Sequence, residues 1–344
     1  MRQLEARGTP WEVGHAIGSA APDLVAESVE LVCRLELPED EVVARLAAIE
    51  RRLAETFPNV VEEAAGLAEG ARVSRRDALV LSVASDLHGK LPGWCSLGAV
   101  PGGDGVLVGK NLDTHEGMAP VQVVERLARE EALEFVHLTA AGAMWTDGGV
   151  NEAGLVLVNS SLDAAAPDPD GVPDGILARE ILARCADVPA AIELASRFSM
   201  MTLGENILVA DAAGRAALIE KLPGGQAIRE AGTIVACNHP LASRLEVLMS
   251  RSDAIRENSE RRLARLAEAS ADRAEWTVDD LGAALADHAG GICQHGADGL
   301  WTIASIVLAP RERRMWVAAG PPCRAAYEEV TSTVGPDKEA QHVR

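Results

Sequence analysis

Thiols are the side chains of this sequence with the most direct route to covalent chemistry. The six cysteines occupy positions 33, 95, 185, 237, 293 and 323. They form no CxxC pair and show no zinc-ligand spacing, and scattered thiols of this kind are mostly small buried hydrophobic residues. Cys95 differs because it stands in GWCSLG, where a helical first third gives way to the first strand. We therefore predict that Cys95 is a catalytic nucleophile.

A cut of the chain between Trp94 and Cys95 would place a thiol and a free α-amine on one residue. An α-amine titrates at about pH 8, so it can accept the thiol proton at neutral pH and act as the base. The cut itself needs only the thiol to attack the preceding carbonyl, which gives a thioester that water opens. The expected chemistry is acyl transfer or amide hydrolysis.

A conventional cysteine–histidine pair is the alternative source of a base. The histidines considered are His88, His115, His239 and His295. His239 is the strongest of them because it adjoins Asn238. No spacing supports any of the four, so each is interpreted as an ordinary polar histidine.

The elements that must position Cys95 begin with helices. Apolar residues recur every three or four positions over 20–34 and 39–55, which predicts two helices. A third is expected in the run after Pro58, and a fourth after Ser74, which is a suitable N-cap. No clear strand is expected before about residue 97.

Short apolar runs separated by Gly-, Asp- or Pro-containing turns predict strands through the rest of the chain. They are LGAV, VLVGKNLD, LEFVHLTA, GLVLVNSSL, NILVADAAGRAALIE, TIVACN, WTIASIVLAP and RRMWVAAG. GVLVGKNLD is expected to pair antiparallel with LEFVHLTA, and NILVADAAG with RAALIEKL. GGDG at 102–105 is expected to be a hairpin turn. Helical patterns at 175–198 and 244–287 interrupt the strands, which indicates sheets covered by helices in an α+β fold.

The charge balance limits the expected partners. The 344 residues include 52 acidic and 32 basic residues, for a formal net charge of -20. Nucleic acid and anionic membranes attract basic patches, so neither is an expected partner. The N-terminus lacks the apolar region of a signal peptide, and no run of about 18 apolar residues predicts a membrane span. We expect a soluble, cytoplasmic protein.

Six segments carry a resemblance to a known family. They are CSLGAVPGGDGVLVGKNLD from residue 95, GVNEAGL at 149–155, GVPDGILAREIL at 171–182, ENILVADAAGRAALIE at 205–220, CNHP at 237–240 and VAAGPPC near 320. In this order, and with GTPWEVGHAIG near the start, they resemble the acyl-CoA:6-aminopenicillanate acyltransferase family, a self-processing branch of the Ntn hydrolases. The likeness covers nearly the full length of the chain.

The resemblance implies a role for each of three residues. Cys95 matches the nucleophile, and Asp113 matches a buried acid near the nucleophile's amine. Asn238 matches the amide donor of the oxyanion hole, where one donor contributes about 3 kcal/mol of transition-state stabilisation. The non-catalytic alternatives are that Asp113 is an ordinary turn residue and that Asn238 is an ordinary turn or cap residue.

Two features depart from the family's pattern. The family has an arginine near the penultimate strand, but DGLWTIASIVLAP contains none, and Thr302 or Ser305 in that place would supply no charge. Trp94 stands where the family usually has glycine before the nucleophile, although Gly93 is one residue earlier. Both departures bear on self-cleavage more than on catalysis by Cys95.

The resemblance implies a four-layer αββα sandwich, with two antiparallel sheets covered by helices. Residues 1–94 would form a helical N-terminal segment like the family's small subunit, residues 95–332 the catalytic sandwich, and residues 333–344 a frayed tail. The implied function is a cysteine-dependent amide hydrolase or acyltransferase that acts on a small amide, peptide-like or acyl-thioester substrate. After cleavage the two fragments would stay associated. No metal or other cofactor is implied. The alternative is a non-catalytic sandwich that serves as a binding or assembly module.

Overall fold

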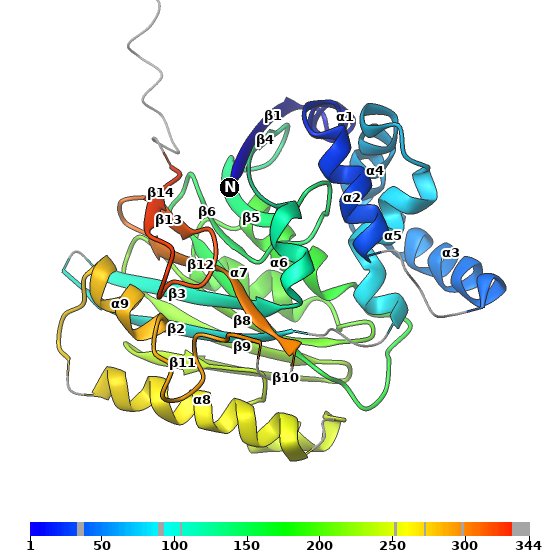
Figure 1. Ribbon diagram of the computed structural model, residues 1–344. Helices are drawn as coiled ribbons and strands as arrows, with labels where there is room; N and C mark the ends of the chain where they lie inside the picture. Colours follow the sequence, from blue (N-terminus) through cyan, green and yellow to red (C-terminus); the bar gives the residue numbers. More distant parts are fainter. Residues whose placement is uncertain are drawn as a thin grey trace, which may run out of the picture.

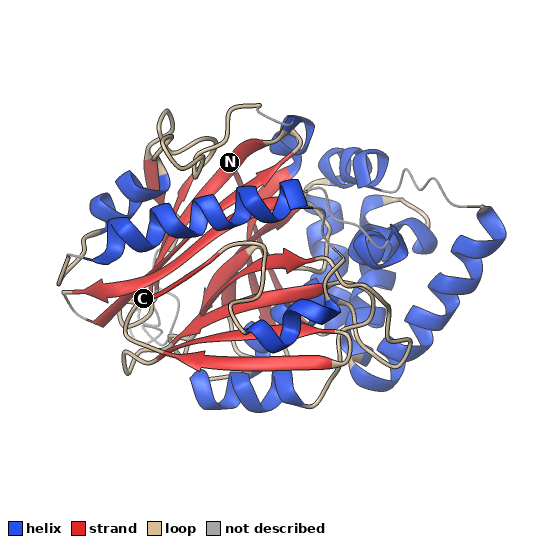
Figure 2. Ribbon diagram, turned by 90° about the horizontal axis from the view of Figure 1, so that it is seen from below, coloured by secondary structure: helices blue, strands red, loops and turns tan. Residues whose placement is uncertain are grey.

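Two stacked β-sheets form the centre of the molecule, and helices cover both outer faces (Figures 1 and 2). The computed structural model describes residues 1–32, 38–88, 93–103, 105–250, 253–271, 273–296 and 299–331. Cys33, Asp104 and the predicted tail at 333–344 lie outside these ranges. Within them, none of the helices is both long and apolar enough to cross a membrane.

The larger sheet has eight strands. In spatial order they are β1 (Arg2–Gly8), β4 (Gln122–Arg129), β5 (Phe135–Ala140), β6 (Gly148–Asn151), β7 (Val156–Leu162), β8 (Gly204–Ala210), β9 (Ala216–Leu222) and β10 (Gly225–Glu230). Neighbouring strands are antiparallel, except that β1 pairs parallel with β4 at one edge. The predicted pairing of NILVADAAG with RAALIEKL is confirmed as β8 beside β9.

The smaller sheet has six antiparallel strands. In spatial order they are β11 (Ile234–Ala236), β2 (Trp94–Gly102), β3 (Gly105–Thr114), β12 (Trp301–Ala309), β13 (Arg314–Ala318) and β14 (Tyr327–Glu329). β2 and β3 form a hairpin in which Gly102 pairs with Gly105, so the predicted turn is confirmed. Gly105 has φ +145°, a conformation that residues with a Cβ rarely adopt.

Three apolar layers hold the molecule together. The first lies between the sheets and includes Leu97, Val136 and Ile306. The second lies between the larger sheet and its helices, and the third between the smaller sheet and its own helices. The four-layer αββα sandwich is therefore confirmed. The helices after Cys95 are η1 (Glu116–Val121), α6 (Asp174–Arg184), α7 (Val188–Ser196), η2 (Ser243–Leu248), α8 (Asp253–Ala271) and α9 (Val278–Leu285).

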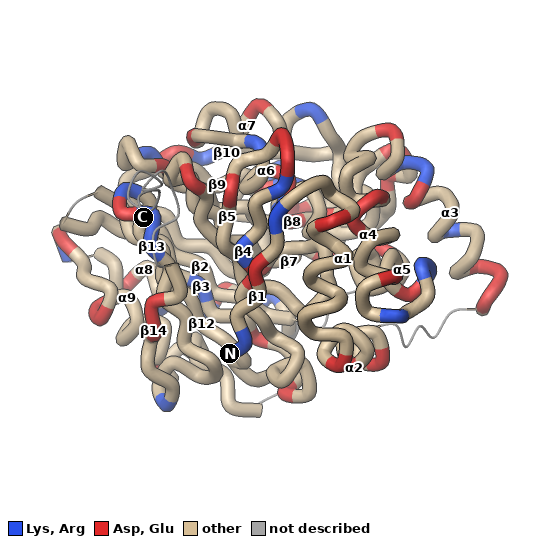
Figure 3. The backbone as a smooth tube through the Cα atoms, turned by 90° about the horizontal axis from the view of Figure 1, so that it is seen from above, with Lys and Arg blue, Asp and Glu red and all other residues tan. Residues whose placement is uncertain are grey.

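In the described residues before Cys95, five helices gather at one end of the molecule (blue to cyan in Figure 1). They are α1 (Pro10–Ala20), α2 (Pro22–Val32), α3 (Glu39–Thr56), α4 (Pro58–Ala71) and α5 (Arg75–His88). The predicted cap is present, because the Asp77 N–H donates to Ser74 Oγ at 3.0 Å. α1 crosses α4 closely, since a Cβ on Gly14 would collide with the Glu63 carbonyl oxygen. Figure 3 shows that α2 carries acidic residues and neither Lys nor Arg.

Two expectations about strands are wrong. The chain begins with strand β1, well before residue 97, and helix α1 follows it. GVLVGKNLD, which forms β3, does not pair with LEFVHLTA, because β3 lies between β2 and β12 in the smaller sheet while β5 belongs to the larger one. Apolar periodicity identifies a strand but does not say which distant strand it joins.

Candidate active site

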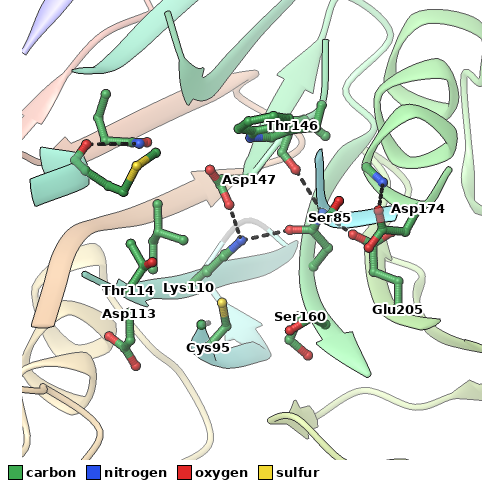
Figure 4. A pocket seen from close by; sticks show the side chains of 18 of the residues that line it. Ser85, Cys95, Lys110, Asp113, Thr114, Thr146, Asp147, Ser160, Asp174 and Glu205 are labelled. Atoms are coloured by element: carbon green, nitrogen blue, oxygen red, sulfur yellow. Dashed lines mark hydrogen bonds and ion pairs between the residues drawn. The ribbon is translucent and has the colours of Figure 1, made fainter. Parts of the chain in front are cut away.

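Cys95 is the second residue of β2, and its side chain points into the layer between the two sheets. It is 6% exposed and lines a cavity of about 160 Å³ (Figure 4). The peptide groups beside the thiol are held by two distant residues. The Cys95 N–H donates to Asn238 Oδ1 at 2.9 Å, and the Cys95 carbonyl accepts from Arg262 Nη1 at 2.6 Å.

The hairpin of β2 and β3 separates the site into two faces. Cys95 pairs with Leu112 and Trp94 pairs with Asp113. Paired side chains point to the same face, and successive ones alternate. The thiol therefore faces the larger sheet, whereas Asp113 faces α8 and α9. In Figure 4 the sulfur lies on the side of Lys110, and the Asp113 carboxylate is directed away from it.

Asp113 is a buried acid close to Cys95 in the hairpin, but its side chain is not on the thiol's face. The side chain is fully buried, and Oδ1 accepts from the Thr302 hydroxyl at 2.6 Å. Burial raises the pKa of Asp113 to about 7, against opposing effects of Arg262, Thr302 and Lys110. Thr302 thus supplies a hydrogen bond to the acid rather than the charge of the family's arginine.

Arg262 of α8 places a positive charge near Asp113 and was missed by sequence reasoning. The side chain is fully buried, and Nη2 donates to Asn238 Oδ1 at 2.9 Å while Nη1 also reaches Ser96 Oγ at 3.2 Å. The guanidinium lies 5.9 Å from the Trp94 ring centroid. One signal was available, because Arg262 follows Ser259 by three positions and precedes Leu266 by four, on the stripe of α8 that is buried.

Asn238 follows β11 and lies beside Cys95, and the atom that contacts Cys95 is the acceptor Oδ1; its role as an oxyanion donor stays a prediction. Besides the contacts of Oδ1 given above, Nδ2 donates to the Ser161 carbonyl at 3.1 Å, and Ser161 lines the cavity. His239 is turned elsewhere, with Nδ1 2.7 Å from Ser259 Oγ. The cavity-lining residues, all from the described part of the chain, include no histidine. The geometry therefore gives no support to a cysteine–histidine pair.

Lys110 is a second residue that the sequence interpretation left unassigned. It is buried, and Nζ lies 3.1 Å from Asp147 Oδ1 and 2.7 Å from Asn159 Oδ1. Burial alone would lower the pKa of Lys110, but Asp147 and then Cys95 raise it above its usual value. Lysine on the same face as Leu112 in the apolar run VLVGKNLD was the signal that could have identified it.

The Cys95 thiol is protonated at neutral pH in the intact chain. Burial raises the pKa of Cys95 to about 11; Lys110 opposes this rise, and Asp113 and Asp147 add to it. A hydrogen bond with the Asp113 backbone lowers the pKa of Cys95 but does not offset the effect of burial. The thiol therefore needs a base before it can attack a carbonyl.

Buried carboxyl groups line the end of the cavity beyond Lys110. Asp174 and Glu205 line it directly. Burial raises the pKa of Asp174 to about 6 and that of Glu205 well above its usual value. Asn159 Nδ2 donates to Glu205 Oε1 at 2.5 Å, which connects Glu205 to Lys110 through Asn159. In the described chain, a group of His and Cys side chains able to hold a metal ion lies elsewhere, at residues 288–323.

Comparison with known proteins supplies a family. The sequence model of the acyl-coenzyme A:6-aminopenicillanic acid acyl-transferase family matches residues 100–324. That range includes Asp113, Asn238 and Arg262 and begins after Cys95. The resemblance noted from sequence is confirmed by this match.

Several solved structures are similar at low identity. Penicillin V acylase from Agrobacterium tumefaciens is 15% identical, with a TM-score of 0.45 over 65% of this chain and 82% of that one. A mutant of conjugated bile acid hydrolase from Clostridium perfringens is 10% identical, with a TM-score of 0.45 over 70% and 98%. A Caenorhabditis elegans ortholog of N-acylethanolamine-hydrolyzing acid amidase is 13% identical, with a TM-score of 0.45 over 63% and 93%.

Proposed function

We propose, since this chain belongs to the acyl-coenzyme A:6-aminopenicillanic acid acyl-transferase family, that it hydrolyses amides or transfers acyl groups through the thiol of Cys95. The observation that carries the proposal is the position of Cys95. The thiol opens into a cavity of about 160 Å³, while Asn238 and Arg262 hold the N–H and the carbonyl of the same residue. A residue so held presents its side chain in one orientation to an incoming carbonyl.

Self-cleavage before Cys95 is the second part of the proposal. The thiol attacks the Trp94 carbonyl, the C–N bond breaks as the amine takes the proton, and water then hydrolyses the thioester. The product is a free α-amine on Cys95. Support comes from the 2.9 Å contact between the Cys95 nitrogen and Asn238 Oδ1, because the same oxygen would then hold the new amine beside its own thiol.

Catalysis would proceed through an acyl-enzyme. The α-amine accepts the thiol proton, and the thiolate attacks the substrate carbonyl to form a tetrahedral intermediate. Nδ2 of Asn238, which donates to the Ser161 carbonyl before the reaction, turns to donate to the oxyanion. The leaving amine or thiol takes the proton from the α-ammonium group. Water or an acceptor amine then releases the acyl group by the same steps in reverse.

The cavity indicates a small substrate group with polar atoms. Its volume of about 160 Å³ is below the range of about 300 to 1,000 Å³ typical of drug-sized ligands. Trp145 and Met118 offer apolar wall, whereas Asp174 and Glu205 offer hydrogen bonds at the far end. A short amide, peptide-like or thioester substrate with a hydrogen-bonding group fits this lining.

The test is the intact mass and the thiol reactivity of purified protein. We expect two fragments that meet at Trp94/Cys95 in the wild type and in Cys185→Ala, a control at another buried cysteine. Cys95→Ala should remain one chain. Incubation with a small activated ester should add one acyl group to the wild type and none to Cys95→Ala.

Other results would change the conclusion. A single chain whose Cys95 is acylated would support a cysteine enzyme with a side-chain base and remove self-cleavage from the proposal. A single chain whose Cys95 resists both acylation and thiol reagents would contradict the enzyme and favour a non-catalytic binding or assembly module.

A further inference from the structure

Four side chains with metal-binding atoms converge outside the lining of the Cys95 cavity. Three come from the loop between α9 and β12, and one from the turn between β13 and β14. The four are His288, Cys293, His295 and Cys323, and their ligand atoms all lie within 4.8 Å of one another. Both cysteines are free thiols. We propose that these four residues form a closed tetrahedral zinc site that has a structural role.

Four of the six distances between the ligand atoms match those of a tetrahedron around one ion. Zn–S bonds of about 2.3 Å and Zn–N bonds of about 2.0 Å place ligand atoms about 3.8 Å apart for S···S, about 3.5 Å for S···N and about 3.3 Å for N···N. The two sulfurs are 3.7 Å apart, and His295 Nε2 lies 3.5 Å from Cys293 Sγ and 3.2 Å from Cys323 Sγ. His288 Nε2 lies 3.1 Å from His295 Nε2.

Hydrogen bonding alone does not account for this convergence. Nε2 of His295 has three of these atoms around it, but a neutral imidazole nitrogen offers either one proton or one lone pair. A metal ion at the shared centre satisfies all four donors together. Two thiolates also neutralise the charge of Zn²⁺, and the mixture of sulfur and imidazole donors is the set that zinc prefers in structural sites.

Backbone hydrogen bonds within the loop fix the conformation of the segment that carries three of the ligands. The Gly291 N–H donates to the His288 carbonyl, and the Cys293 N–H donates to the Asp287 carbonyl, each at 3.0 Å. Asp287 is in turn held by Arg265 of α8 at 2.6 Å. Four protein ligands leave no position for a substrate, which is why the proposed role is structural rather than catalytic.

The proposed site would also stabilise the surroundings of the candidate acid. Gln294 lies between two ligands, and its N–H donates to the Thr302 hydroxyl at 2.8 Å. The same hydroxyl donates to Asp113 at 2.6 Å. Zinc would join this loop to the turn that contains Cys323 and so fix the donor that holds Asp113.

The experiment measures zinc in the full-length chain. Protein purified under reducing conditions is stripped with a chelator, reloaded with zinc chloride, desalted and assayed for metal. We expect about one zinc ion per chain in the wild type. Cobalt in its place should give the intense visible absorption of tetrahedral thiolate coordination.

Variants at exposed ligands test the assignment without disturbing the core. Cys323→Ser and His288→Ala should weaken zinc binding by more than about 100-fold, since loss of a second-shell partner alone costs about 10- to 100-fold. Cys185→Ser and His115→Ala, outside the cluster, should bind as the wild type does. Cys95→Ala should also bind zinc normally. A failure of the zinc proposal can therefore be distinguished from a failure of the proposed enzymatic function.

Three results would overturn the zinc site. The wild type could hold no more zinc than Cys323→Ser, all variants could hold it equally, or freshly isolated protein could contain a Cys293–Cys323 disulfide. Thiol counting before and after reduction detects the last of these, and far-ultraviolet circular dichroism verifies that each variant is folded.

Discussion

Cys95 and Cys293 are both buried at the smaller sheet, with 6% and 3% of their surfaces exposed. Around Cys95 lie an amide, a guanidinium and the ammonium group of Lys110, which position its backbone or oppose the rise in its pKa. Around Cys293 lie atoms with lone pairs, from His295 and Cys323. The two sets of neighbours suit the two proposed roles, attack on a carbonyl for Cys95 and metal binding for Cys293.

The two sites also differ in how the chain assembles them. The hydrogen bond from Arg262 to Cys95 joins residues 167 positions apart, whereas the four proposed ligands all lie within residues 288–323. The Cys95 site therefore depends on the complete stacking of both sheets, and the ligand cluster on one loop and one turn. We expect the two to respond differently to mutation.

The largest expected effect follows from loss of the Cys95 thiol. Cys95→Ala should lower kcat/KM for amide hydrolysis or acyl transfer by about 10⁴-fold or more, as for other nucleophile deletions. Its zinc content should not change. Cys185→Ala is the matched control and should keep full activity. A Cys95→Ala protein with more than about a tenth of wild-type activity would show that the thiol is not the nucleophile.

The protonation of Asp113 should make stability depend on pH. The pKa of Asp113 is about 7 in the folded protein and 3.8 without perturbation. Between these two pH values the folded protein keeps a proton on Asp113 that the unfolded chain has released. The stability that this group contributes is complete below about pH 4 and is lost as the pH rises through 7, by up to about 4 kcal/mol. Measured by urea unfolding between pH 4 and 8, the free energy of unfolding of Asp113→Asn should decline less with rising pH than that of the wild type. Parallel curves for the two proteins would contradict the raised pKa.

Arg262 should contribute to stability as well as to the site. Arg262→Met removes the donor to four buried acceptors, on Cys95, Ser96, Asn238 and Asn258, and a buried acceptor left unsatisfied costs about 1 to 3 kcal/mol. We expect the free energy of unfolding to fall by about 3 kcal/mol, measured by chemical denaturation. Arg261→Met, a change at the exposed neighbouring position of the same helix, should alter it by less than about 0.5 kcal/mol.

The smallest expected effect links the two sites. Loss of zinc in Cys323→Ser should lower kcat by about 2- to 30-fold through Gln294, Thr302 and Asp113, the range for changes along a contact network. Chelation of the wild type should reproduce the loss, and added zinc should reverse it in the wild type only. A kcat unchanged by either treatment would show that the sites are independent.

The sequence predicted the elements better than their arrangement. The periodicity of helices α3 and α4 and the cap of α5 are local properties, so they were readable from a single chain. β1 was missed because RQLEARG alternates weakly and is charged, and its place is set by β4, more than a hundred residues later. The partner of β3 was missed for the same reason, since β12 is distant in sequence.

The candidate site was predictable where family motifs carried it. Cys95, Asp113 and Asn238 came from the resemblance, and the structure brings all three to one hairpin and its surroundings. Their catalytic roles remain predictions. Arg262 was not predictable in this way because it reaches the site from a helix instead of the penultimate strand. The ligand spacing of 288, 293, 295 and 323 also matches no familiar zinc motif, since its geometry exists only in the folded loop.

The parallel pairing of β1 with β4 has a consequence for a cleaved chain. Residues 2–8 supply the edge strand of the larger sheet, so a fragment that ends at Trp94 would be a permanent strand donor rather than a removable propeptide. Its departure would expose the unpaired edge of β4 and the apolar surface beneath α1, which invites aggregation. Separately expressed fragments should therefore regain structure only when mixed, as in fragment complementation.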